Sequence, residues 1–140
     1  MIRFRILLIM ILFCLGQSLP ASARDRETGA SSSRYTVRID MKEAYISGLC
    51  IIKEDGFLVT ASIMNEFGVS LMTVKYDLQK DRIRLESSLK PLKRPAVKRI
   101  LKKDFKILLN EYLASGKTDS SLQLTHENTR HDINYNLIPL

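Results

Sequence analysis

The sequence predicts an α+β fold in which a curved antiparallel sheet is covered by one amphipathic helix. Three observations lead to this prediction. Short segments between residues 35 and 86 alternate apolar and polar residues, and turn-forming residues separate them. Apolar residues then recur at helical spacing from about residue 96 to residue 114. Because consecutive strands joined by tight turns usually pair with each other, we expect an antiparallel meander.

Each predicted strand is bounded by a recognisable turn. Tyr35, Val37 and Ile39 point to one side of the first strand. Asp55-Gly56 is a strong hairpin signal after the second, and the turn at residues 65–68 follows the third. A polar stretch at 126–131 joins the last two. The predicted strands are 35–39, 43–54, 57–64, 70–77, 82–86, 121–125 and 132–138.

The predicted helix runs from about Ala96 to Ala114. Pro95 suits the first helical turn because that position needs no backbone N–H, and Gly116 suits a C-terminal stop. One side of this helix is apolar. The other side carries Lys98, Arg99, Lys102, Lys103 and Lys106.

The first 23 residues are predicted to be an export signal. Arg3 and Arg5 form a basic start, residues 6–15 are apolar but too few to span a bilayer, and Ala21-Ser22-Ala23 provides a cleavage site. We expect cleavage after Ala23 and a periplasmic protein. Residues 24–34 are polar and are predicted to be a disordered leader, so the folded domain is 35–140.

The two cysteines have different predicted roles. Cys14 is a candidate lipid-attachment site, which would make the protein an outer-membrane lipoprotein. The bulky Phe13 before it disfavours this alternative. Cys50 lies in an apolar run and is expected to be a buried small hydrophobe.

The basic residues are concentrated in one segment. The chain carries 22 Lys and Arg against 15 Asp and Glu, and residues 90–106 contain eight of these cations with Asp104 as the one carboxylate. This face has three interpretations: a solvated helix surface, a docking surface for anionic membrane, or a nucleic-acid site. The last is disfavoured because an exported protein rarely meets nucleic acid and no interleaved aromatics mark a stacking surface.

No catalytic constellation, phosphate loop or cofactor motif is recognisable, and we predict neither enzyme activity nor a cofactor. His126 and His131 are the only histidines, with Glu127 and Asp132 beside them. A metal site there is less expected than ordinary surface-loop residues.

The predicted sheet and helix place two apolar surfaces against each other. Tight packing would make them a core, whereas a sheet that curves away would leave a pocket for a ligand. The sheet contributes Val59, Ala61, Ile63, Met72, Val74 and Tyr76, and the helix contributes Ile100, Leu101, Phe105 and Leu108.

Residues 57–109 resemble the central part of LolB-like and LolA-like lipoprotein carriers. The resemblance rests on Asn65-Glu66-Phe67-Gly68, the strand 71–77, the turn and short strand 81–83, and the helix. Asp132-Ile133-Asn134-Tyr135 also resembles the strand that follows the helices in that family. The family continues into further strands beyond the position of Leu140, so the resemblance implies an incomplete half-barrel.

The resemblance implies non-enzymatic binding of an acyl chain or lipoprotein in transit to the outer membrane, by a monomer. The ten apolar residues above would line the ligand site, and the five cations would contact the membrane. Phe67 has two placements, folded into the core, which is favoured, or protruding into the membrane with those cations. The alternative function is a secreted protein-interaction adaptor with a filled core and a basic docking helix.

Overall fold

The computed structural model describes residues 31–116 and 121–140, and the predicted export signal, its cleavage site and Cys14 lie outside these residues. The strands are β1 (Ser31–Asp40), β2 (Tyr45–Asp55), β3 (Leu58–Met64), β4 (Ser70–Asp77), β5 (Arg82–Ser87), β6 (Leu124–Asn128) and β7 (Ile133–Pro139). A short 3-10 turn, η2 (Lys90–Lys93), precedes helix α2 (Pro95–Glu111), which continues into a π-helical turn, η3 (Tyr112–Gly116).

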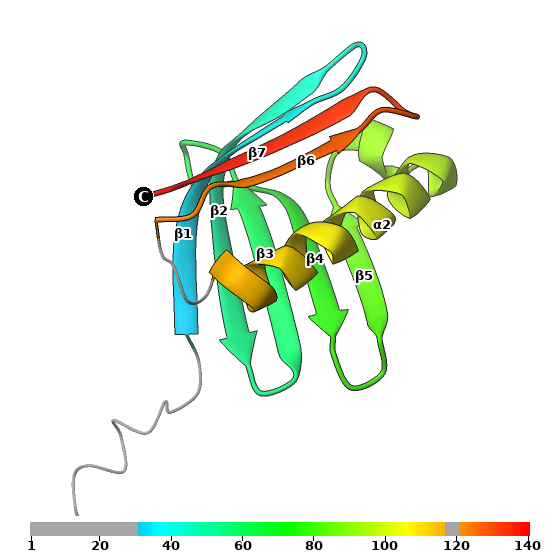
Figure 1. Cartoon of the computed structure of the whole chain (residues 1–140). Helices are drawn as coiled ribbons and strands as arrows, with labels where there is room; N and C mark the ends of the chain where they lie inside the picture. The colour runs from blue at the N-terminus through cyan, green and yellow to red at the C-terminus, as the bar shows by residue number, and fades with distance from the viewer. Residues whose placement is uncertain (1–30, 117–120) are drawn as a thin grey trace, which may run out of the picture.

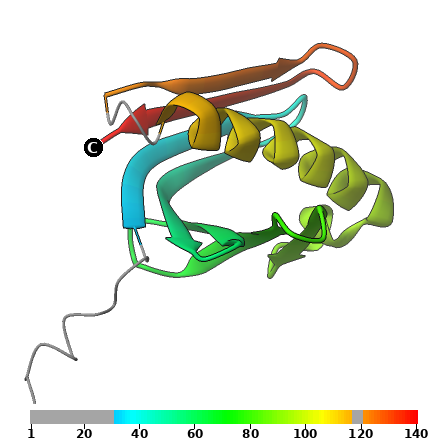
Figure 2. The ribbon, with the colours of Figure 1, turned by 60° about the horizontal axis from the view of Figure 1, so that its bottom comes forward.

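The seven strands form one antiparallel sheet in the order β5-β4-β3-β2-β1-β7-β6. The sheet curls into a half-barrel, and α2 lies across its concave side (Figure 1). In the view of Figure 2, β6 and β7 lie above the helix and β4 and β5 below it. Because α2 contacts both edge strands, β5 and β6, it bridges the open side of the half-barrel. The predicted fold class and the meander of the first five strands are confirmed.

Local sequence explains how the hairpins form. Gly56 has a φ of +59° in the β2–β3 turn, a conformation that costs glycine little. Gly48 lies where β2 passes the end of β3, and a Cβ there would overlap the carbonyl oxygen of Met64. The close approach of these two strands therefore requires a residue without a side chain.

The core fills the space between the concave side of the sheet and α2. Leu101, Phe105 and Leu108 point inward from the helix, and each is at most 2% exposed. Cys50 is fully buried, as predicted, and burial raises the pKa of its thiol to about 12. Phe105 and Tyr135 pack edge to face with ring centroids 5.7 Å apart, which ties the helix to β7.

Three sequence predictions differ from the structure. Ser31–Arg34 were assigned to a disordered leader, but they belong to β1 because they pair with residues 51–54 of β2. The strand predicted at 121–125 is displaced to Leu124–Asn128, since β6 pairs with Ile133–Leu137 of β7. His126 is therefore a strand residue and not part of a link.

Within residues 31–116 and 121–140, no helix combines the length and the apolar character needed to cross a bilayer.

Candidate functional site

The ten apolar residues predicted to line a ligand site are brought together by the fold. Nine of them are at most 4% exposed and belong to one continuous core cluster. They are Val59, Ala61, Ile63, Met72, Val74, Tyr76, Leu101, Phe105 and Leu108. The tenth, Ile100, is partly buried and packs at the edge of this cluster. The side chains of the nine thus fill the interior of the half-barrel.

A groove of about 640 Å³ lies outside this core, between α2 and the hairpin of β6 and β7. Its volume is in the range of roughly 300–1,000 Å³ that is usual for small-molecule sites. Ala96, Ile100 and Ile107 provide aliphatic side chains from the helix, and Ile107 is 46% exposed. From the opposite side, residues 126–131 line the groove. Ile100 is the one predicted ligand residue that lines it.

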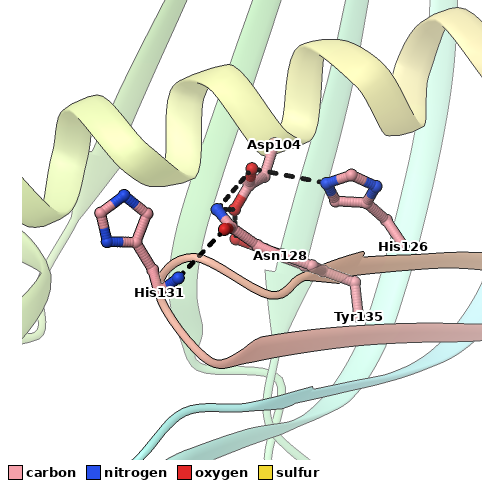
Figure 3. Close-up of polar contacts among 5 residues, drawn as sticks. All are labelled: Asp104, His126, Asn128, His131 and Tyr135. Carbon is pink, nitrogen blue, oxygen red and sulfur yellow. Dashed lines mark hydrogen bonds and ion pairs between the residues drawn. The ribbon is translucent and has the colours of Figure 1, made fainter.

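A buried carboxylate also lines the groove. Asp104 is 3% exposed and accepts hydrogen bonds from Asn128 Nδ2 at 3.0 Å to each oxygen (Figure 3). The Tyr135 hydroxyl donates to Asp104 Oδ2 at 2.6 Å, and His126 Nε2 lies 3.5 Å from Oδ1. Buried charge is costly unless it is paired or hydrogen-bonded, and these contacts meet that need. Asp104 therefore fastens α2 to the β6–β7 hairpin.

Burial and a hydrogen bond keep the phenol of Tyr135 protonated. Burial raises the pKa of Tyr135 far above its usual range, and the hydrogen bond to Asp104 raises it further. The phenol therefore stays protonated and acts as a donor to the carboxylate at ordinary pH. Tyr135 and Asn128 together donate hydrogen bonds to both carboxylate oxygens of Asp104. This arrangement is typical of a structural contact that holds the helix against the hairpin.

The two histidines, predicted to be ordinary surface-loop residues, differ in their surroundings. His126 is 21% exposed at its side chain and stacks at a tilt on Tyr135, with ring centroids 5.7 Å apart. The prediction of a surface loop is wrong for His126, because this residue belongs to β6, which packs against α2. His131 is exposed in the β6–β7 turn, where its backbone N–H donates to Asn128 Oδ1 at 3.2 Å. Both line the groove.

The five cations predicted to contact a membrane occupy different parts of α2. Arg99 and Lys103 line the groove. A second, smaller hollow of about 320 Å³ is lined by Lys98 and Lys102, and Arg99 borders it as well. Lys106 is paired with Asp81 at 2.9 Å. This carboxylate also accepts a hydrogen bond from the Tyr76 hydroxyl at 2.6 Å.

Tyr76 and Lys106 both lower the pKa of the Asp81 carboxyl. The Tyr76 hydroxyl, and then the ammonium of Lys106, lower its pKa below the usual value. The contact joins α2 to the β4–β5 turn. The helix is thus tied by carboxylates at both sides of the half-barrel, by Asp81 on one side and by Asp104 on the other.

Phe67 protrudes from the molecule, and the expectation that it folds into the core is wrong. Its side chain is 81% exposed. The Asn65 side chain closes the β3–β4 turn by accepting hydrogen bonds from the backbone N–H groups of Phe67 at 3.0 Å and Val69 at 2.9 Å. Gly68 completes the turn with a φ of +77°. A turn closed in this way directs the phenyl group away from the sheet.

Comparison of the chain with protein-family models and with curated proteins finds no match. The sequence does not predict this groove, because half of its lining comes from residues 126–131, whose polar composition is typical of a link between strands. One signal was present: Asp104 is the only carboxylate among the cations of residues 90–106 and stands on the apolar side of the helix, next to Phe105. A charged residue in that position requires partners from another element.

Proposed function

We propose that this protein binds the acyl chain of a lipid or lipoprotein in the groove between α2 and the β6–β7 hairpin. It would carry that chain through the periplasm toward the outer membrane without covalent chemistry. The observation that supports the proposal is a groove to which Ala96, Ile100 and Ile107 contribute aliphatic side chains. Ile107 is 46% exposed, whereas Leu108 beside it in the chain is 2% exposed. Ile107 thus presents to solvent the kind of surface that a chain of methylene groups would cover.

The dimensions of the groove suit an extended chain. Ala96 and Ile107 both line it, and they lie eleven positions apart on the helix, a distance of about 16 Å. Each methylene group removed from water contributes about 0.8 kcal/mol, so a chain of ten or more groups would bind favourably even after its ordering cost. Because the groove lies outside the packed core, a chain would enter and leave it without unfolding that core.

The cations and the exposed turn provide surfaces for docking on an acceptor membrane. Each cation held near anionic lipid contributes about 1 kcal/mol. Lys98 and Lys102 are available for this, and Phe67 adds an exposed aromatic ring at the tip of the β3–β4 turn. These contacts would bring the carrier to the bilayer, and the hydrophobic groove would then exchange its cargo.

Binding of a fluorescent fatty acid tests the proposal with two matched variants. Ile107→Ser introduces a polar group into the groove, whereas Ile138→Ser makes the same change at a residue of equal exposure, 47%, on β7 outside it. We expect saturable binding by the wild type and by Ile138→Ser. Ile107→Ser should bind at least several-fold more weakly, since a buried aliphatic contact is lost. Absence of saturable binding by the wild type would refute the proposal.

A second function, a protein-interaction adaptor, is favoured by the filled interior. The sheet and helix residues that would line a large internal pocket are packed together. Enlarging Val74, which is fully buried, distinguishes a groove from an internal ligand site. Val74→Phe should lower stability through overpacking, while the fraction that remains folded still binds in the groove. If no acyl probe binds the wild type, the adaptor function is the one to pursue.

A further inference from the structure

The groove is bordered by cations that form no ion pair with any residue that the structure describes. Arg99 and Lys103 stand one helical turn apart on α2, and Arg130 comes from the β6–β7 turn. Among the residues at 31–116 and 121–140, none of these three side chains makes a salt bridge. Lys106, on the same helix, differs in this respect because it is paired with Asp81 at 2.9 Å.

The carboxylates in the groove offset this positive rim only in part. Asp104 is buried, and both of its oxygens already accept hydrogen bonds from Asn128 and Tyr135. Glu127 is exposed on β6 and is the other carboxylate of the lining. The lining therefore carries three cations against two carboxylates, a net charge of +1, beside the aliphatic side chains of Ala96, Ile100 and Ile107. This combination complements a ligand that has an anionic group at one end and an apolar chain at the other.

The first turn of α2 adds to the positive character of one end of the groove. Ala96 lies in this turn and lines the groove, and the turn contains no acidic residue. No side chain caps the helix at Arg94, so backbone N–H groups of the first turn lack a capping acceptor. The N-terminal end of a helix favours negative charge. Arg99 stands on the next turn of the helix.

We infer that the occupant of the groove is an anionic single-chain amphiphile, with its headgroup at Arg99, Lys103 and Arg130 and its chain along Ile100 and Ile107. This inference rests on the proposed function and adds the charge and orientation of the ligand. The carrier would thereby select anionic lipid over zwitterionic or neutral lipid with the same chain. Charge-assisted contacts to a phosphate or carboxylate supply the discrimination.

Two lysophospholipids that share one acyl chain provide the test: lysophosphatidylglycerol, which is anionic, and lysophosphatidylcholine, which is zwitterionic. Both are titrated against the full chain at low ionic strength and below their micelle concentrations. We expect the anionic lipid to bind about tenfold more tightly, the change that corresponds to one charge-assisted contact. Glycerol 3-phosphate, which has the charge without the chain, should not compete at comparable concentration.

A matched pair of double variants locates the effect. Arg99→Gln with Lys103→Gln removes two rim cations, and Lys75→Gln with Arg84→Gln removes the same net charge from β4 and β5, outside the groove. The rim variant should lose about tenfold in affinity for the anionic lipid and keep its affinity for the zwitterionic one. The control variant should keep both affinities.

The titrations distinguish an anionic amphiphile from a lipid of any charge, from a free phosphate and from no ligand in the groove. Equal affinities of the wild type for the two lipids, or an equal loss in the two double variants, would overturn the anionic assignment while acyl binding still stands. Competition by glycerol 3-phosphate alone would replace the amphiphile with a free phosphate ligand. If neither lipid binds, the proposed function itself fails.

Discussion

Replacing Asp104 with alanine tests how the helix is held to the hairpin. The carboxylate is buried and accepts three hydrogen bonds, one from the Tyr135 hydroxyl at 2.6 Å and two from Asn128 Nδ2 at 3.0 Å. Asp104→Ala leaves the phenol of Tyr135, which is 2% exposed, without an acceptor. A buried donor left unsatisfied costs about 1–3 kcal/mol.

The loss for Asn128 is smaller because its side chain is only half-buried and water can reach it. Relief of the desolvation of Asp104 offsets part of the cost. We therefore expect the free energy of unfolding to fall by about 2–4 kcal/mol. Urea unfolding followed by circular dichroism measures this change, provided that the slope of the transition is unchanged.

Asp81→Ala is the matched control for the same measurement. Asp81 also accepts from a tyrosine hydroxyl at 2.6 Å and pairs with a lysine, but its side chain is 63% exposed. Its replacement should cost clearly less than that of Asp104, because water screens an exposed ion pair. Adding Tyr135→Phe to Asp104→Ala should cost less than the sum of the single changes, since they remove one interaction. A loss for Asp104→Ala no larger than that for Asp81→Ala would refute the reasoning.

Three further predictions concern the sheet and the surface. Gly48→Ala should destabilise the fold by about 2–3 kcal/mol, measured by thermal unfolding, because its Cβ would overlap the Met64 carbonyl oxygen; an unchanged melting temperature would contradict this. With the other cysteine changed to serine, Cys50 should react with a thiol reagent at pH 8 only after unfolding, since burial raises its pKa to about 12. The Tyr76 hydroxyl lowers the pKa of the Asp81 carboxyl below its ordinary value of 3.8. The ionised Asp81 therefore stabilises the folded state fully above pH 3.8, and this stabilisation is lost as the pH falls through the folded-state pKa. Wild type and Asp81→Asn should therefore converge in stability in acid, and a constant difference would exclude this linkage.

Much of the fold was predictable because alternation and turn chemistry are local signals. The strand Ser70–Asp77 was predicted with its observed bounds, and Asp55-Gly56 forms the expected turn. The errors arise where a distant partner decides the structure. Ser31–Arg34 have a composition typical of disorder, but the free edge of β2 at residues 51–54 extends the strand. Nothing in the serine run itself carries that information.

The candidate site was harder to predict than the fold. The apolar residues on the sheet and the helix were correctly placed together, but their pattern is the same for a core and for a pocket, and side-chain volume decides between them. The groove depends on how the hairpin of β6 and β7 packs against α2. That arrangement is fixed by Asp104, Asn128 and Tyr135, whose contacts join residues at least 24 positions apart in the chain.

Photo-crosslinking tests the central claim most directly. A fatty acid with a diazirine on its chain is bound to the purified protein, irradiated, and mapped by peptide mass spectrometry. We predict saturable labelling of the groove, on the peptides that contain Ile100, Ile107 and residues 126–131, and its loss in Ile107→Ser. Labelling of interior residues such as Val74, or labelling that does not saturate, would contradict the account.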